Sequence, residues 1–185
     1  MTNLLTIDKI TFKTKILTTA AAILAAVVLP QIFHAVGVIS GQGAALGETF
    51  LPMQLPVILA GLLAGPIVGI VVGVLSPLIS FGFSGMPGAV ILPFIIIELA
   101  GYGLAAGVLS KVKMMAFSKL LLIQIAGRML RASAILFAVY GLESQVINAA
   151  GIWNFVIGGL PGILLQWCLF PLIMFWIESG KKYND

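Results

Sequence analysis

Long apolar runs, separated by glycine, proline and short polar stretches, form the main pattern along this chain. Runs of this length are typical of membrane-spanning helices, each of which needs about 20 apolar residues. The dipeptide Gly65-Pro66 marks one break, because proline suits the first turn of a helix and disfavours helical geometry in the preceding residue. The pattern predicts six helices, over about 15–36, 53–64, 66–83, 89–109, 117–140 and 152–178, with Pro161 and Gly162 interrupting the last.

The composition places these helices in lipid. Apolar residues make up 61% of the 185 positions and charged residues 9%, against about 45–50% and about 25% in soluble domains. These few polar residues are not enough to cover the surface of a soluble protein. The apolar side chains must therefore face the lipid of a bilayer. We therefore expect an all-α membrane protein whose single domain, residues 1–185, is one bundle of six transmembrane helices.

The first apolar run is expected to be a retained helix rather than a signal peptide. Residues 16–36 are about as long as a full span. The small residues Ala20 to Ala22 lie at the start of this run, where a cleavage site would not lie. The single cysteine, Cys168, excludes an internal disulfide and a cysteine-based metal site.

The distribution of lysine and arginine predicts the orientation, because cytoplasmic loops carry an excess of these residues. With six helices and a cytoplasmic N-terminus, the inner segments contain Lys9, Lys13, Lys15, Lys111, Lys113, Lys119, Lys181 and Lys182. The outer connections, about 37–52, 84–88 and 141–151, contain no Lys or Arg. Both termini are therefore expected in the cytoplasm. We expect this multi-pass chain in the plasma membrane of the cell, which would be a bacterial inner or cytoplasmic membrane. The net charge of +4 then reflects topology rather than nucleic-acid binding.

Small residues recur every four positions in two segments. The glycines are Gly61, Gly65, Gly69 and Gly73, and the alanine pairs in the first helix are Ala21 with Ala25 and Ala22 with Ala26. Small residues at this spacing let helix backbones approach closely in lipid. The glycines favour packing within the bundle, whereas the alanines fit either internal packing or an external face for another subunit.

Polar groups at membrane depth are costly, which makes each of them a functional hypothesis. Glu98 and Arg131 are each expected about nine residues from the outer end of their helices, and Arg128 lies one turn deeper than Arg131. A structural ion pair between Glu98 and one arginine is one explanation. A ligand site is the other, since two arginines against one carboxylate leave a surplus positive charge.

A second polar group is expected at the outer ends of the helices. Its members are Gln31, His34, Gln54, Asn148, Trp153 and Asn154, with Tyr102 one turn below Glu98. Singly, such residues are often solvated or act as interfacial anchors. Together they favour an outward-facing pocket lined by aromatic rings and amides, which suits the capture of a small molecule.

The sequence gives little support for an enzymatic function. The segment Gly82-Phe83-Ser84-Gly85 matches the GxSG pattern of rhomboid-like intramembrane proteases, but the one histidine, His34, precedes this serine instead of following it on a later helix. One histidine, one cysteine and one intramembrane carboxylate do not make a metal site. The chain also lacks a GxxxxGK[ST] phosphate loop, so it does not itself hydrolyse ATP to drive transport. We expect no catalytic residue, no bound metal and no cofactor.

Several short motifs, in this order and spacing, resemble the S components of energy-coupling factor (ECF) transporters. They are the stretch from Leu51 to Gly61 (LPMQLPVILAG), Gly65-Pro66, Ser76-Pro77, Gly85-Met86-Pro87, the stretch from Glu98 to Gly103 (ELAGYG) and Gly127-Arg128. The resemblance covers about residues 15–178. It implies a high-affinity substrate-capture subunit of an ABC importer, which takes up a water-soluble vitamin or its precursor.

The resemblance also implies partners and sites. S components dock through their first helix on the transmembrane coupling protein EcfT, which two ATPase subunits drive, so ATP is used by the partners. By position, Ala21, Ala22, Ala25 and Ala26 match the docking stripe, and Glu98, Tyr102, Arg128, Arg131, Trp153 and Asn154 would surround the ligand. The residues favour pyridoxine or a hydroxymethylpyrimidine-like heterocycle. A carboxylate vitamin such as pantothenate or niacin, and a stand-alone secondary carrier, remain alternatives.

Overall fold

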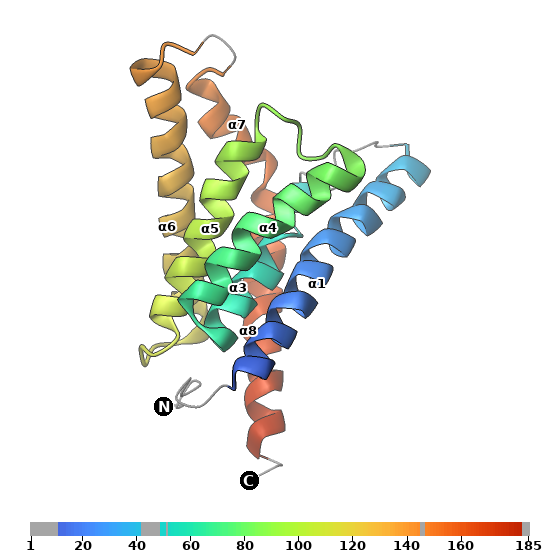
Figure 1. The fold of residues 1–185 in the computed structure, drawn as a ribbon, viewed down its shortest axis with the longest axis vertical. Helices are drawn as coiled ribbons and strands as arrows, with labels where there is room; N and C mark the ends of the chain where they lie inside the picture. Colours follow the sequence, from blue (N-terminus) through green and yellow to red (C-terminus); the bar gives the residue numbers. More distant parts are fainter. Residues whose placement is uncertain (1–10, 42–48, 51, 145–146, 183–185) are drawn as a thin grey trace.

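The computed structural model describes residues 11–41, 49–50, 52–144 and 147–182, and this part of the chain contains helices and no strands. The long helices are α1 (Phe12–Ile39), α4 (Pro66–Ser84), α5 (Leu92–Leu109), α6 (Ala116–Leu136) and α8 (Leu160–Lys182). Two shorter helices, α3 (Gln54–Ala64) and α7 (Ala150–Gly158), complete the bundle, and a π-helical turn, η1 (Phe137–Gly141), extends α6. Figure 1 shows their arrangement. The all-helical prediction is confirmed for the described residues.

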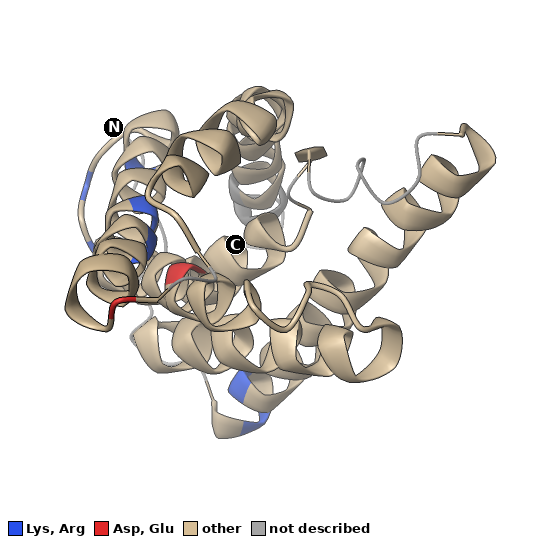
Figure 2. Ribbon diagram, turned by 90° about the horizontal axis from the view of Figure 1, so that it is seen from above, with Lys and Arg blue, Asp and Glu red and all other residues tan. Residues whose placement is uncertain are grey.

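Five helical segments in the described part are long and apolar enough to cross a membrane: Phe12–Ile39, Pro66–Ser84, Leu92–Leu109, Ala116–Gly141 and Leu160–Ile177. The helix α3 is equally apolar but has 11 residues, which corresponds to about 16 Å at 1.5 Å per residue. That is well short of a bilayer core of about 30 Å. The ribbon carries few charged positions (Figure 2), as expected of a helical multi-pass membrane protein.

The last predicted helix is in fact two helices. The break lies at Gly159, between α7 and α8, and not at Pro161 and Gly162 as expected. Pro161 is instead the second residue of α8. Proline is well tolerated there, because the first-turn N–H groups of a helix have no intrahelical partner to lose.

The helix α5 lies at the centre of the packing. It contacts α3, α4 and α6, and α3 fills the space between α1, α4 and α5. The core of the bundle is apolar and includes Val57, Ile58, Leu62, Val72, Leu99, Tyr102, Leu120, Ile123 and Phe170. This central position makes α5 the wall against which the other helices place their inward-facing side chains.

Glycines allow α5 to approach α3 and α4 at backbone distance. A Cβ atom added to Gly61 would lie 2.5 Å from the carbonyl oxygen of Gly103, and one added to Gly73 would lie 2.5 Å from that of Leu99. Gly69 faces the backbone of Gly103 even more closely. The expected internal packing is therefore confirmed for these three glycines. Gly65 has a different role: its φ of 97° forms the break between α3 and α4, a conformation that favours glycine.

The alanines of α1 divide between two faces. Ala26 is fully buried, and Ala22 packs against the apolar core, so these two contact the chain itself. Ala26 is therefore closed to an external partner in this structure, whereas Ala22 is half-buried. Ala21 is exposed and Ala25 is half-buried, which leaves the outer part of the stripe on Ala21 and Ala25.

The contact between Gly69 and Gly103 offers a test of this packing. We expect Gly69→Ala to lower the unfolding temperature in detergent, because the added methyl meets backbone that cannot rotate away; overpacking costs about 1–3 kcal/mol. Gly82→Ala is the matched control on the same helix, since no atom lies within 4 Å of its added Cβ. Equal unfolding temperatures for the two variants would contradict close α4–α5 packing.

Candidate functional site

A cavity of about 130 Å³ lies within the bundle. Its lining comes from α1, α3, α4, α5, α6 and α7 and from the segments before α3 and α5. The lining residues are Pro30, His34, Pro52, Met53, Gln54, Ser80, Met86, Pro87, Gly88, Ile91, Ile95, Glu98, Leu99, Arg131 and Phe155. The cavity lies toward the upper end of the bundle in Figure 1, because the α4–α5 connection and α7 contribute to it. A cavity of about 150 Å³ is known to accept benzene, so this one suits a single small ring.

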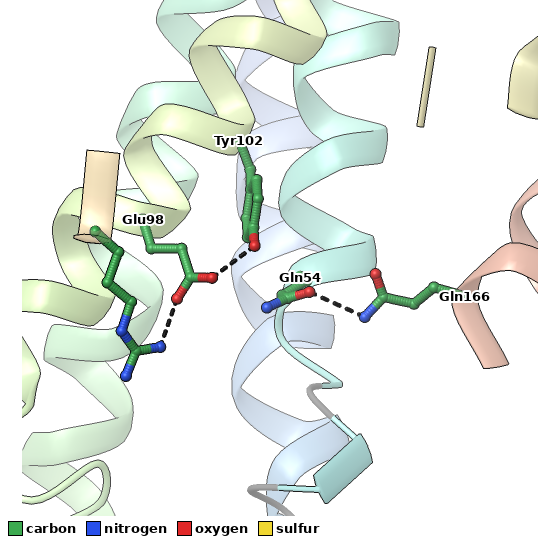
Figure 3. A network of polar contacts seen from close by, with 5 residues as sticks. Gln54, Glu98, Tyr102 and Gln166 are labelled. Atoms are coloured by element: carbon green, nitrogen blue, oxygen red, sulfur yellow. Dashed lines mark hydrogen bonds and ion pairs between the residues drawn. The ribbon is translucent and has the colours of Figure 1, made fainter. Parts of the chain in front are cut away.

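The centre of the site is an ion pair between Glu98 and Arg131. The Nη1 atom of Arg131 donates to Oε2 of Glu98 at 2.6 Å, and the Tyr102 hydroxyl donates to Oε1 at 2.6 Å (Figure 3). Glu98 is 3% exposed and Arg131 9%. A buried carboxylate is costly unless it is paired and hydrogen-bonded, and here each of its oxygens has a partner.

Local sequence explains this geometry. Glu98 and Tyr102 are four residues apart on α5, so their side chains lie on one face of the helix. Gly127 of α6 leaves room for the ring of Tyr102, since a Cβ there would collide with that ring. Arg131 follows Gly127 by one turn on the same face of α6 and therefore reaches Glu98 directly above the tyrosine.

The guanidinium group of Arg131 keeps unused hydrogen-bonding capacity. Its carbon Cζ lies 3.9 Å from the centre of the Phe155 ring, a cation–π contact. Its Nε and Nη2 atoms are buried without a hydrogen-bond partner in the described part of the chain. Buried donors without partners are rare in folded proteins. Arg131 is one of the residues that line the cavity, so a ligand with acceptor groups would lie close to this guanidinium group.

A chain of amide hydrogen bonds reaches the cavity from the opposite side. Gln166 donates through Nε2 to Oε1 of Gln54 at 3.1 Å (Figure 3), and Gln124 donates to Oε1 of Gln166 at 2.9 Å. The indole Nε1 of Trp167 donates to Oε1 of Gln124 at 2.8 Å. We call these four residues the glutamine relay. It connects α3, α6 and α8, and Gln54 is its end in the cavity.

Only some of the residues that the sequence predicts around a ligand line the cavity. Glu98, Arg131, Gln54 and His34 line the cavity, and Tyr102 lies beneath it as a support for Glu98. Gln31 does not line it; its Nε2 donates to the hydroxyl of Ser84.

Arg128 also lies outside the lining, and its Nη2 is buried without a hydrogen-bond partner among the described residues. The ion pair that the sequence left open between two arginines therefore involves Arg131. Arg128 keeps the surplus positive charge of the site.

On α7 the cavity is lined by Phe155 and not by the two residues expected there. Trp153 is 68% exposed and Asn154 is exposed, while Phe155 faces the cavity. Successive residues of a helix point about 100° apart, so when Phe155 faces inward its two predecessors are directed elsewhere. Asn148 lies beside a second, more apolar cavity that shares Ile91 and Phe155 with the first.

Sequence reasoning missed Phe155, Ser80 and the rest of the relay: Gln124, Gln166 and Trp167. Gln124 and Gln166 each stand inside a long apolar run, and intramembrane polarity was a signal that could have identified them. Phe155 carries no such signal, because an aromatic residue in an apolar helix is unremarkable by itself.

The serine of the GxSG match is engaged in local structure. The Ser84 hydroxyl donates to the carbonyl of Ser80 at 2.8 Å and accepts from Gln31 at 3.1 Å. Within the described ranges, no three His, Cys, Asp or Glu side chains gather into a metal-binding group. The cavity thus offers hydrogen-bond donors, one ion pair and an aromatic face. No protein-family model, curated protein or solved structure matches this chain.

The ion pair can be tested for its structural contribution. We expect Arg131→Met to destabilise the fold by about 3–5 kcal/mol, because it leaves the Glu98 carboxylate buried without its partner charge. In the double variant Glu98→Gln/Arg131→Met most of this loss should be recovered, since no isolated charge remains. Thermal or denaturant unfolding of the purified chain measures both.

Arg128→Met is the matched control, because the structure gives Arg128 no ion pair in the described part of the chain. A loss of stability in this control as large as in Arg131→Met would contradict the assignment of the pair.

Proposed function

We propose that this chain is the substrate-capture subunit of an ECF-type ABC importer, an S component that binds a water-soluble vitamin or vitamin precursor. The observation that carries the proposal is the small cavity inside a helical membrane bundle, lined by Arg131, whose buried Nε and Nη2 donors have no partner among the described residues. A cavity with a few convergent polar groups is the usual form of a small-molecule site. The motifs from Leu51 to Arg128 that resemble S components supply the rest of the argument.

The proposed orientation places the cavity toward the outside. Lys13 and Lys15 begin α1, and Lys111 and Lys113 lie in the α5–α6 connection, all at the lower end of the bundle in Figure 1. The connections at the cavity end, 40–53, 85–91 and 142–149, contain no Lys or Arg. By the positive-inside rule the cavity end then faces outward. Six passes, with α3 as a short second pass, and cytoplasmic termini are part of this proposal.

The ligand is proposed to be a compact, hydroxylated heterocycle such as pyridoxine or hydroxymethylpyrimidine. A single substituted ring suits the cavity volume, and its ring nitrogen and hydroxyl groups can accept hydrogen bonds from Arg131. Niacin or pantothenate is the alternative within the same role. This alternative is favoured by the positive charge of Arg128, which no carboxylate in the described residues neutralises.

Transport in this proposal depends on partners. The exposed face of α1 around Ala21 and Ala25 would dock on the coupling protein EcfT, and two ATPase subunits would supply the energy. Small side chains at this spacing favour close contact between helices in a membrane. The chain would capture the vitamin and its partners would hydrolyse ATP.

Binding at the cavity can be tested on α7 with two neighbouring residues. We expect Phe155→Ala to weaken binding about tenfold or more, about 1.4 kcal/mol, because it removes the ring that covers Arg131. Asn154→Ala is the matched control and should leave the affinity unchanged. Calorimetry with pyridoxine, hydroxymethylpyrimidine, nicotinate and pantothenate measures the effect, and mass spectrometry of molecules that co-purify identifies the natural ligand. Equal effects of the two variants would contradict the site.

Docking through α1 has its own test. We expect Ala21→Trp to abolish ATP-dependent uptake by the assembled complex and to leave ligand affinity unchanged, because the large ring prevents close helix contact far from the cavity. Val108→Trp, on the lipid-exposed face of α5, should be active. If the purified chain alone, in liposomes, moved ligand as fast as the complex, the chain would be a secondary carrier instead.

A further inference from the structure

The glutamine relay has a fixed direction. An indole N–H is only a donor, so the Trp167 contact requires the oxygen of Gln124 to face α8. The Gln124 amide nitrogen must then point to Gln166, and the nitrogen of Gln166 to Gln54. The three glutamines are well shielded, since Gln54 and Gln124 are 4% exposed and Gln166 is 1% exposed, and Trp167 is half-buried.

This direction leaves the amide nitrogen of Gln54 as the free end of the relay in the described part of the chain. Its oxygen is occupied by Gln166, and its nitrogen is turned toward the Glu98 and Tyr102 side (Figure 3). This nitrogen makes no hydrogen bond within the described part of the chain, and Gln54 lines the cavity. Reversing the Gln54 amide alone would turn its NH₂ group toward the NH₂ group of Gln166, and reversing all three amides would leave the Trp167 N–H without an acceptor. Both arrangements are unfavourable.

We propose that Gln54 is a specificity-determining residue that only donates to the ligand, and that Gln166, Gln124 and Trp167 are positioning residues that hold it in this state. The inference rests on the proposed capture function and deepens it. An amide usually adapts to either a donor or an acceptor by rotating. Here the relay prevents the Gln54 amide from rotating. Trp167, which sets the direction of the relay, does not itself line the cavity.

The remaining polar groups of the site determine the ligand chemistry. Each oxygen of Glu98 already accepts one hydrogen bond, from Arg131 or from Tyr102, whereas Nε and Nη2 of Arg131 have no partner among the described residues. The cavity therefore offers donors from Gln54 on α3 and from Arg131 on α6. The matching ligand is a single ring that presents acceptors in both directions: a ring nitrogen, a carbonyl or a carboxylate. A ligand that turns an N–H toward Gln54 is rejected.

The test uses nicotinate and nicotinamide as probes, because they share ring and size but nicotinamide replaces one acceptor oxygen with an NH₂ donor. Binding to the purified chain in nanodiscs is measured by ligand-observed NMR. For the wild type we expect nicotinate to bind about tenfold more tightly, since an unpaired donor is penalised strongly in a hydrogen-bonding site. Trp167→Phe keeps the ring packing on Phe117 but removes the indole N–H. The preference should then fall by about threefold or more, because Gln54 can reverse.

Trp176→Phe is the matched control on the same helix, with a side chain that is 78% exposed, and it should keep the wild-type preference. If Trp167→Phe weakens both probes equally and keeps their ratio, the relay is only structural and the inference is overturned. Equal binding of the two probes to the wild type overturns it as well, and so does the absence of binding.

The capture function has a separate outcome. A chain that co-purifies with a vitamin but keeps its probe ratio in Trp167→Phe refutes the relay and leaves the capture function standing. A chain whose ratio changes as expected, but which supports no uptake with EcfT and the ATPases, refutes the importer role and supports the relay.

Discussion

The buried pair of Glu98 and Arg131 is the interaction on which the site depends. A lone carboxylate at this depth would be very costly, and pairing at 2.6 Å makes it tolerable. The pair joins α5 to α6, and the Tyr102 hydroxyl completes the coordination of the carboxylate. Because each oxygen of Glu98 already has a partner, the donors without partners in the described part of the site belong to Arg131 and Gln54. This asymmetry makes the cavity rich in donors.

Close backbone packing keeps the pair in position. Gly61, Gly69 and Gly73 bring α3 and α4 against α5 at distances that a Cβ would not permit. Gly127 does the same for α6 at the ring of Tyr102. In lipid, where apolar surfaces gain little from contact with each other, such close van der Waals packing is a main source of helix association. The cavity therefore lies against closely packed helices on its α4, α5 and α6 sides.

The third element of the site is the break between α7 and α8. The break lets Phe155 on α7 cover Arg131. On α8, Gln166 donates to Gln54 and Trp167 donates to Gln124. A single straight helix carries its side chains along one continuous spiral, whereas two helices can be directed separately. The break thus lets one stretch of chain contribute an aromatic cover and a polar relay to the same cavity.

The sequence by itself determined the class of structure and the presence of opposite charges at membrane depth. Apolar run lengths predicted the helices, Gly65-Pro66 predicted a break, and Glu98 and Arg131 are the opposite charges expected at similar depth. Helical periodicity says which residues share a face, but not which neighbour that face meets. Only the tertiary structure therefore decided that Phe155 and not Trp153 faces inward and that Ala26 is buried while Ala21 is exposed. For the same reason it alone joined Gln54 to Gln166, 112 positions apart in the chain, since such a contact depends on how three helices pack together.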